Sequence, residues 1–176
     1  MTVRTDEELV ASYRAGDERA ADELVRRHSV SLGRYLYASG ADPGDIEDLT
    51  QEAFFKAFQA LAGWRREASF KSWLFRIAGN LSKDLFRRRK GRQVVSIDDH
   101  EVADSSDPEG ETGAQEMETR FLAEIDRLPR LQREVFLLRV QQGLDYEEIC
   151  ATLGTTPGAA RVHYHHAVKR LKEHLQ

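Results

Sequence analysis

The sequence contains a single cysteine, Cys150, so no intrachain disulfide can form. It has no apolar run long enough to span a bilayer, and its first ten residues contain no apolar signal core. We therefore expect a cytoplasmic protein without membrane insertion. A nucleophile–base pair, a metal-ligand spacing and a glycine-rich phosphate loop are also missing, so we expect no enzymatic activity, no cofactor and no metal site.

Lysine and arginine are absent from residues 94–119, which contain nine acidic residues. Low hydrophobicity with one sign of charge cannot offset the entropy lost on ordering, so this segment is predicted to be a flexible acidic linker. Residues 1–93 and 120–176 carry net charges of +3 and +2, so the overall charge of −4 arises in the linker. No strand-like alternation appears on either side of it. The sequence therefore predicts an all-α fold of two small helical domains, 1–93 and 120–176, joined by the linker.

Apolar periodicity predicts three helices in the first part of the chain, at about 6–15, 18–38 and 43–62. His28 lies on the partly apolar face of the second helix, where we interpret it as a core-edge histidine rather than a ligand. The third helix has more aromatic surface than one narrow stripe can bury, contributed by Phe54, Phe55 and Phe58. Either this helix is buried on two sides, or part of it docks on a partner.

Residues 64–92 form a basic segment, in which ten Lys/Arg stand against two acids. Ser69 can cap a helix whose apolar seam begins with Phe70 and Trp73. Cations at the end of this helix also suit its macrodipole, but helix stabilisation does not require ten of them. A basic helix behind a tryptophan-containing loop is the footprint expected for a nucleic-acid surface.

The second domain contains a helix-turn-helix pattern. Asp145 and Glu148 resemble a capping box that opens a short helix, and Gly154 allows a sharp turn after it. Thr156 and Pro157 then start a longer helix. Since the second helix of this motif enters the major groove, the DNA-facing candidates near its start are Thr155, Thr156, Gly158, Ala159 and Arg161. Its inward face is predicted to consist of Val162, Ala167, Val168 and Leu171.

Three segments carry a family resemblance that extends over nearly the whole chain outside the linker: DIEDLTQEAFFKAF (45–58), FKSWLFRIAGNLSKDLFRRRK (70–90) and LPRLQREVFLLRVQQGLDYEEICATLGTTPGAARVHYHHAVKRL (128–171). By these segments, in this order, the chain resembles the extracytoplasmic-function (ECF) sigma factors of bacterial RNA polymerase. In that family they are the polymerase-binding helix, the −10 promoter segment and the −35-binding domain. The resemblance implies a dissociable subunit that binds core polymerase and directs promoter-specific transcription initiation.

The resemblance also implies roles for single positions. Docking on the clamp helices of the polymerase largest subunit is implied for Asp48, Gln51, Glu52 and Phe55, which leaves Phe54 and Phe58 to the core. The loop 63–69 falls where the family captures a flipped −10 base, whose unstacking can be offset by stacking on an aromatic or arginine plane. The −10 contact candidates are Trp64, Arg65, Arg66, Lys71, Arg76, Asn80, Lys83, Arg87 and Arg88. Trp73 lies on the apolar seam and is assigned to the core.

The recognition helix departs from the family pattern at two positions. His163 and His166 stand where arginines are usual, while His165 matches. All three are added to the −35 candidates, and we expect −35 binding to be weaker and more pH-sensitive because neutral histidines do not attract phosphates. A metal site is the alternative, since His163 and His166 are one helical turn apart, but two histidines without a third ligand seldom hold a metal well.

Two rival interpretations of the chain differ in their partners. A helix-turn-helix regulator that is not a polymerase subunit would have no need for a docking surface at 48–55. An enzyme fits poorly, because the acids of the linker have no fixed geometry. The resemblance implies double- and single-stranded promoter DNA and an anti-sigma factor as partners, and no homo-oligomer is expected.

Overall fold

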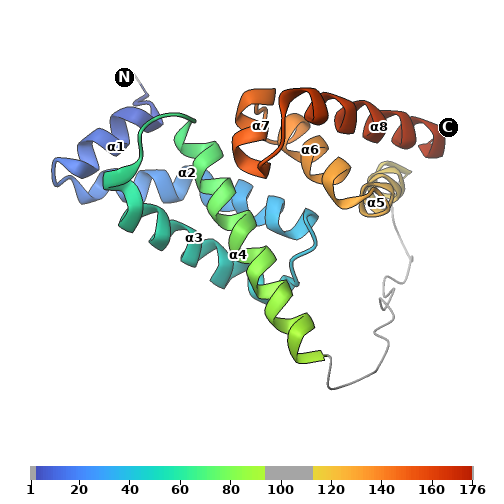
Figure 1. Cartoon of the computed structure of the whole chain (residues 1–176), viewed down its shortest axis with the longest axis horizontal. Helices are drawn as coiled ribbons and strands as arrows, with labels where there is room; N and C mark the ends of the chain where they lie inside the picture. Colours follow the sequence, from blue (N-terminus) through green and yellow to red (C-terminus); the bar gives the residue numbers. More distant parts are fainter. Residues whose placement is uncertain (1–2, 94–112, 176) are drawn as a thin grey trace.

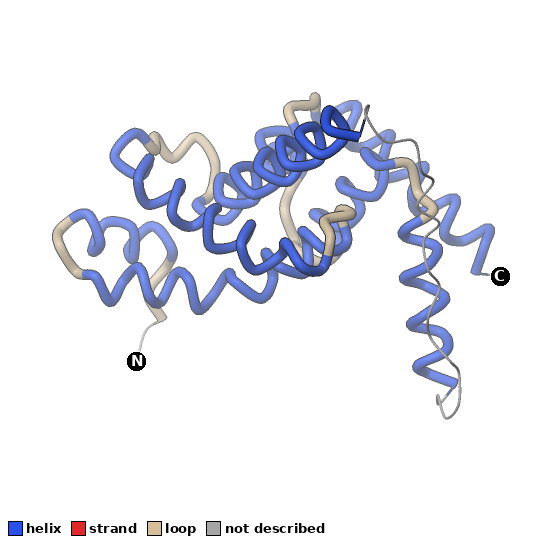
Figure 2. The backbone as a smooth tube through the Cα atoms, turned by 90° about the horizontal axis from the view of Figure 1, so that it is seen from below, coloured by secondary structure: helices blue, strands red, loops and turns tan. Residues whose placement is uncertain are grey.

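The computed structural model describes residues 3–93 and 113–175, and every regular element in these ranges is a helix (Figures 1 and 2). The helices are α1 Asp6–Arg14, α2 Glu18–Ala38, α3 Ile46–Ala60, α4 Phe70–Gln93, α5 Gly113–Asp126, α6 Arg130–Val140, α7 Tyr146–Leu153 and α8 Pro157–Leu175. Two 3-10 turns flank α3, η1 Pro43–Asp45 and η2 Leu61–Gly63. The all-α prediction is confirmed. None of these helices is both long and apolar enough to cross a membrane.

Local capping signals explain where several helices begin and end. The Ser69 hydroxyl accepts a hydrogen bond from the backbone N–H of Ser72 at 3.2 Å, at the start of α4. Asp145 and Glu148 form the expected capping box at the start of α7, with the Glu148 N–H donating to the Asp145 carboxylate at 2.8 Å. Gly154 then ends α7 in the left-handed conformation, at φ 67°.

Two boundaries differ from those predicted from the sequence. The helix α5 begins at Gly113, so residues 113–119 are helical rather than part of the linker. The rest of the predicted linker, residues 94–112, lies outside the described residues. The segment Pro43–Asp45 forms a 3-10 turn, and α3 itself begins at Ile46. Periodicity alone cannot separate a 3-10 turn from the first turn of an α-helix, because both place similar residues on the same side.

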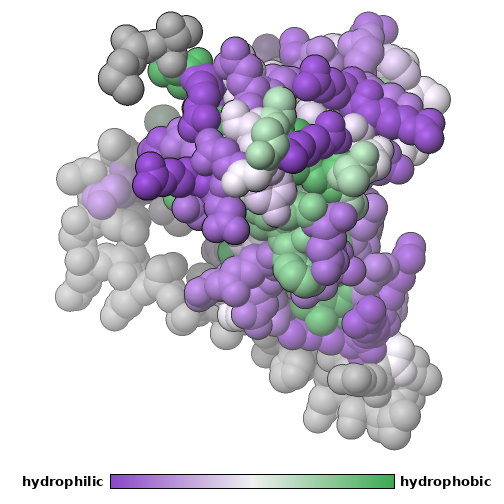
Figure 3. Space-filling view, turned by 90° about the vertical axis from the view of Figure 1, so that its left-hand side faces the viewer, coloured by the Kyte–Doolittle hydropathy of each residue, from purple (hydrophilic) through white to green (hydrophobic). Residues whose placement is uncertain are grey.

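The helices α1 to α4 enclose an apolar core built around the N-terminal half of α4. Phe70, Leu74 and Phe75 of α4 are fully buried, and the Phe75 ring lies 5.2 Å from that of Tyr35 of α2. The surface at the α1 end of the molecule is mostly hydrophilic, with one band of apolar residues across it (Figure 3). The burial of Phe70, Leu74 and Phe75 confirms the predicted apolar seam of the basic helix, which forms the centre of this core.

The C-terminal helices form a small core of their own and also add to the first. The separate cluster contains Ile125, Leu128, Phe136, Leu137, Ala167 and Leu171. Other buried side chains join the core of α1–α4 instead: Val135, Leu138, Leu144, Ile149 and Ala160. As Figure 1 shows, α7 lies against α4, and the two sequence domains share one apolar core.

Polar groups are buried in this contact between α4 and α7. The Lys71 ammonium donates to the backbone carbonyl of Gln142 at 2.7 Å. The Thr152 hydroxyl shares its proton between the carbonyl of Glu148 in its own helix, at 2.8 Å, and the carbonyl of Ser72 across the contact, at 3.2 Å. Ser72 and Thr152 are both buried. Because a buried polar group without a partner is costly, these hydrogen bonds favour this one arrangement of the two halves over a displaced one.

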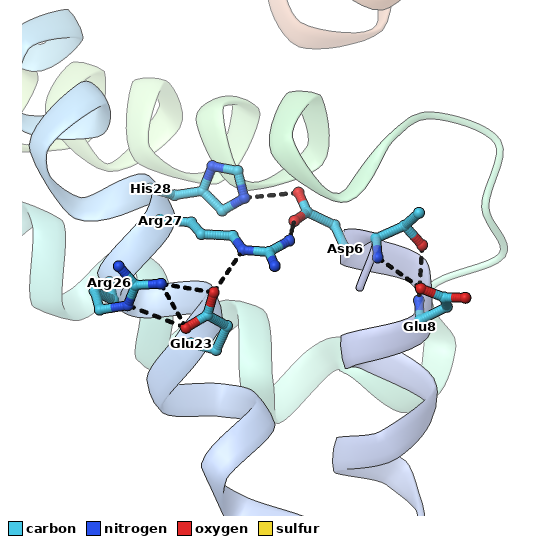
Figure 4. A network of polar contacts seen from close by, with 7 residues as sticks. Asp6, Glu8, Glu23, Arg26, Arg27 and His28 are labelled. Atoms are coloured by element: carbon cyan, nitrogen blue, oxygen red, sulfur yellow. Dashed lines mark hydrogen bonds and ion pairs between the residues drawn. The ribbon is translucent and has the colours of Figure 1, made fainter. Parts of the chain in front are cut away.

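A network of charged side chains attaches α1 to α2 (Figure 4). The Asp6 carboxylate lies 2.6 Å from His28 Nε2 and 3.1 Å from Arg27 Nη1, and Arg27 also pairs with Glu23 at 2.9 Å. His28 is only 8% exposed, and its ring lies 5.9 Å from that of Phe70 at the start of α4. The interpretation of His28 as a core-edge residue is thus confirmed. Burial alone would raise the pKa of Asp6, but the hydrogen bonds and charges of His28 and Arg27 outweigh it and hold that pKa below its ordinary value.

Replacing Asp6 with Asn should lower the free energy of unfolding at pH 7 by about 1–3 kcal/mol, because charge-assisted hydrogen bonds to a half-buried carboxylate are lost. Since the folded-state pKa is lowered, the contribution is fully present above the ordinary aspartate pKa of about 4 and is lost as the pH falls through the lower value. Denaturant unfolding of both proteins from pH 7 to pH 3 should show their difference shrinking. The exposed Asp22→Asn variant is the control, and an equal loss there would contradict the assignment.

Candidate nucleic-acid interface

A stripe of polar and basic side chains runs along the outer face of α4. Arg76, Asn80, Lys83 and Arg87 follow one another at four-, three- and four-residue steps, so they share one face of the helix. Three of them are exposed and Lys83 is partly exposed. The stripe is about 16 Å long at 1.5 Å per residue, which is enough to follow several phosphates of one strand. Arg88, beside its end, is also exposed.

Arg89 belongs to the same run of cations but has a different environment. Its guanidinium contacts the carboxylate of Asp42 and lies 2.6 Å from an oxygen of Asp45. These acids precede α3, so the pair ties the C-terminal part of α4 to the start of the neighbouring helix. Arg87, by contrast, lies 3.9 Å from Asp84 in a fully solvated pair, which is weak. Arg87, Arg88 and Lys90 are exposed, and none of them has a close carboxylate partner of the kind that holds Arg89.

The structure buries the tryptophan that the sequence assigned to the −10 base. Trp64 is 7% exposed, and its ring stacks on Trp73 with centroids 6.1 Å apart and meets Phe70 edge-on. The Trp64 ring buries its apolar surface against the apolar seam of α4, which explains why it is not exposed as a −10 contact residue would be. A direct contact between Trp64 and a base remains a prediction, and it requires the ring to leave this position.

The loop after Trp64 presents two arginines to solvent. Arg65 and Arg66 are exposed, and Arg66 has a positive φ of 59°, a conformation that costs energy for a residue with a side chain. Arg14 of α1 holds the base of the loop by donating to the backbone carbonyls of Leu61 and Trp64, the latter at 3.2 Å. Arg14 thus fixes the backbone at the start of the loop, while Arg65 and Arg66 face the solvent.

Lys71 is the other −10 candidate whose side chain is not free in this conformation. Its ammonium bonds the carbonyl of Gln142 and lies 5.9 Å above the Phe75 ring. Burial lowers the pKa of Lys71, and the charges of Glu148 and Asp6 oppose that shift. The sequence could not reveal this contact, because it joins residues 71 positions apart. A contact between Lys71 and DNA stays a prediction, and in this conformation the Lys71 ammonium is bound to Gln142.

The helix-turn-helix presents most of its candidates as expected. The Thr156 hydroxyl caps α8 by accepting from the Ala159 N–H at 3.2 Å. Among the candidates on α8, Gly158, Arg161, His165 and His166 are exposed, as is Thr156, while Thr155, Ala159 and His163 are partly exposed.

The predicted inward face of α8 was wrong at one position. Val162 is 52% exposed, and the buried positions are instead Ala160, Ala167 and Leu171. These three follow at seven- and four-residue steps and set the phase of the helix. Val162 lies off that phase.

The histidines of α8 do not come together as a metal site. The rings of His165 and His166 lie 6.3 Å apart on the exposed side. His163 is partly buried, and its Nδ1 is enclosed without a hydrogen-bond partner in the described part of the chain. Within residues 3–93 and 113–175, no three His, Cys, Asp or Glu side chains are grouped so that they could hold a metal ion. The alternative of a histidine metal site therefore lacks its third ligand there.

The outer face of α3 carries the four polymerase-docking candidates. Asp48, Gln51, Glu52 and Phe55 are all exposed and share one helical face. Phe55 is 61% exposed, whereas Phe54 is buried and stacks with Phe58, which packs on the core. The assignment of Phe54 and Phe58 to the core is confirmed, and the docking role of Phe55 stays a prediction.

An apolar groove that the sequence did not reveal borders this face. It lies between α2 and α3, has a volume of about 570 Å³ and is lined mainly by Val25, Val30, Gly33, Ile46, Thr50 and Phe54. Gly33 brings the two helices close, since a Cβ there would lie 3.4 Å from Ile46. Gln51 belongs both to the groove and to the docking candidates, so the two surfaces are continuous. An exposed valine at position 30 of an otherwise amphipathic α2 was the available sequence signal.

Comparison with known families assigns both halves of the chain. Residues 24–92 match the family model Sigma-70 region 2, and residues 118–171 match Sigma-70, region 4. The two matches cover the basic segment with its neighbouring α3 and the helix-turn-helix. They define a protein of the sigma-70 family, a class without enzymatic activity.

Individual relatives show which branch of the sigma-70 family the chain resembles. The chain is 34% identical over 166 residues to the ECF RNA polymerase sigma factor SigE of Mycolicibacterium smegmatis, of which it spans 64%. It is 31% identical over 186 residues to the RNA polymerase sigma-H factor of Pseudomonas aeruginosa, and this alignment covers all of this chain and 96% of that protein. The solved structure of CnrH in complex with the cytosolic domain of CnrY has a TM-score of 0.71 and 27% identity, covering 96% of this chain and 95% of that one.

The chain belongs to the ECF sigma factors, which bind RNA polymerase and direct promoter-specific initiation. A helix-turn-helix regulator with an unrelated first domain is excluded, because that domain matches region 2.

Replacing Arg87 and Arg88 together with Gln should reduce the salt dependence of promoter binding by the holoenzyme. Each phosphate contact contributes a slope of about 0.7–0.9, so the plot of log affinity against log salt should flatten by about 1.4–1.8. The Arg89→Gln variant is the matched control, because its guanidinium is already paired with two carboxylates. An equal slope change in the control, or an unchanged slope in the double variant, would contradict the assignment.

Proposed function

We propose that this sigma factor docks on the clamp helices of the polymerase largest subunit through the exposed face of α3 and the adjoining groove. The observation that carries this proposal is the exposure of Phe55 beside an apolar groove whose rim contains Gln51. Exposed aromatic and apolar surface with a polar rim is typical of a protein interface. Asp48 and Glu52 supply that rim with charge, which favours a partner surface with basic groups.

The −10 element is proposed to contact the exposed stripe of α4 and the loop before it. Arg76, Lys83 and Arg87 would follow the backbone, while Arg65 and Arg66 flank the pocket for an unpaired base. The −35 element is proposed to receive the start of α8 in its major groove. The exposure of the residues on both elements supports these roles.

The observed packing of α4 on α7 is proposed to be a closed form that must open on the promoter. The centres of elements at −10 and −35 are 25 base pairs apart, or roughly 85 Å at 3.4 Å per base pair. In the structure, Lys71 at the start of α4 touches Gln142 of the second half, and α4 and α8 are about 36 Å and about 28 Å long, so even end to end they fall short of that distance. Opening would also free Lys71 for the −10 strand.

A protein inhibitor is proposed to act on the closed form. The structure of CnrH in complex with the cytosolic domain of CnrY covers 96% of this chain, which supports a protein partner for the same fold here. The partner proposed for this chain is an anti-sigma factor. The site of action is proposed to be the cytoplasm, where a polymerase subunit would meet promoter DNA. A homo-oligomer is not part of the proposal.

Replacing Phe55 with Ala should weaken binding to core polymerase by about 2 kcal/mol, or about thirtyfold, as expected for a central aromatic anchor. Affinity is measured by titration with core polymerase, and transcription in vitro on genomic DNA reports initiation. The control is Tyr37→Ala, which removes an aromatic side chain that is also 61% exposed but lies at the end of α2. If the Phe55 variant is folded and binds polymerase as tightly as the parent does, the docking assignment is wrong.

Replacing Thr152 with Glu should open the two halves of the free protein. A carboxylate at this buried position, facing the carbonyl of Ser72, costs several kcal/mol unless the contact separates. Small-angle scattering should show a larger radius of gyration, with the helical circular dichroism retained, and single-stranded −10 DNA should bind more tightly. Gln141→Glu, at an exposed position close by, should change neither. A Thr152 variant that stays compact and binds DNA like the parent would contradict the closed-form proposal.

A further inference from the structure

Tyr146 contacts two guanidinium groups within the helix-turn-helix. The Arg139 guanidinium lies 5.0 Å and the Arg161 guanidinium 5.2 Å from the centre of its ring. Arg139 comes from the end of α6, Tyr146 starts α7, and Arg161 lies in the second turn of α8. One aromatic ring thus connects all three helices of the DNA-reading unit through cation–π contacts.

The ring itself is held on several sides. Tyr146 follows the capping box of α7, which fixes its backbone, and its ring meets that of Tyr164 edge-on at 6.4 Å. Tyr164 in turn stacks on Phe136 at 6.1 Å, inside the C-terminal core. Because the ring is anchored to the core through other rings, it is a rigid support for whatever lies on it.

The two arginines on this support differ in what else they bind. Arg139 also donates to the backbone carbonyl of Leu144 at 2.8 Å, so it is bound into the turn before α7. Arg161 is exposed, and within residues 3–93 and 113–175 no hydrogen bond or ion pair occupies its guanidinium. The N–H groups of Arg161 are therefore available to an acceptor outside the protein.

Arg161 is the only Lys or Arg between Gly154 and Val168, the part of the chain that faces DNA in a helix-turn-helix. His163 and His166 replace arginines usual in the family, and the Nδ1 of His163 is enclosed. A neutral imidazole does not replace a permanent charge. Between Gly154 and Val168 the chain thus carries one permanent positive charge, so the placement of that guanidinium matters for an acceptor on DNA.

We propose that Tyr146 is a positioning residue for −35 recognition, whose ring holds the guanidinium of Arg161 in the orientation that meets the DNA. The proposal rests on the promoter-binding role given above for α8. A free arginine loses rotamer freedom when it binds, whereas one already stacked on a ring loses less, so the support contributes affinity through preorganisation. The acceptor is an oxygen or ring nitrogen of DNA, either on a guanine edge or on a phosphate.

The test compares four holoenzymes on one promoter: the parent, Tyr146→Leu, Arg161→Gln and the double variant. Tyr146→Leu keeps apolar bulk but removes the ring, and it should weaken promoter binding about two- to tenfold. In the Arg161→Gln background the same change should have almost no further effect. Tyr146→Phe keeps the ring and should restore the parent affinity, which a role for the hydroxyl or for general stability would not predict.

Two further measurements on the parent and on Tyr146→Leu, base discrimination and salt dependence, show whether Arg161 binds a guanine or a phosphate. If Arg161 meets a guanine, the variant loses discrimination against single −35 base changes while its salt slope is unchanged. If it meets a phosphate, discrimination is kept and the slope falls by about 0.9.

Additive losses from the two substitutions, or a Phe variant as weak as the Leu variant, would overturn the inference. Core-polymerase affinity and the melting temperature of each variant exclude misfolding. Failure of the parent holoenzyme to bind any promoter would instead remove the proposed function, so the two failures are distinguishable.

Discussion

The contact between α4 and α7 joins the two halves of the chain through buried hydrogen bonds as well as through apolar side chains. Lys71 donates to a backbone carbonyl on the other side, and the Thr152 hydroxyl shares its proton between Ser72 across the contact and Glu148 in its own helix, so separating the halves leaves the Lys71 ammonium and the carbonyls of Gln142 and Ser72 to bind water. Hydrogen bonds to particular carbonyls also fix one register of the two helices, which apolar packing alone would leave adjustable. The positions of the α4 stripe and of α8 relative to each other depend on this contact.

Neighbouring side chains decide which of the many arginines are available to a partner. Arg89 is paired with Asp42 and Asp45, and Arg14 is used to hold the backbone of the loop before α4. Arg87 has only a distant, solvated carboxylate, and Arg161 has an aromatic ring that supports it without occupying its N–H groups. Net charge, which is the quantity visible in a sequence, does not distinguish paired arginines from available ones. The contacts made on folding decide which arginines are paired.

Much of the fold could be predicted from the sequence because its signals are local. Ser69, Asp145 with Glu148, and Gly154 act within three or four residues, and each acts in the structure as its type predicts. The sequence could not predict the burial of Trp64 or the bond from Lys71 to Gln142, because these depend on which distant surfaces meet. The groove between α2 and α3 was missed for the same reason, and the error at Val162 came from a helical phase set by small residues with a weak periodic signal.

The use of Lys71 in the contact between the halves has a consequence for promoter occupancy if this packing is the closed form proposed above. A protein whose binding-competent form is only a fraction of the population binds with an affinity reduced by that fraction, so an open fraction of about one in a hundred would raise the apparent dissociation constant about a hundredfold. The strength of the contact between α4 and α7 would then determine the concentration at which the holoenzyme occupies its promoter. Substitutions at Thr152, which touches neither DNA nor polymerase in the proposed complex, would shift that concentration.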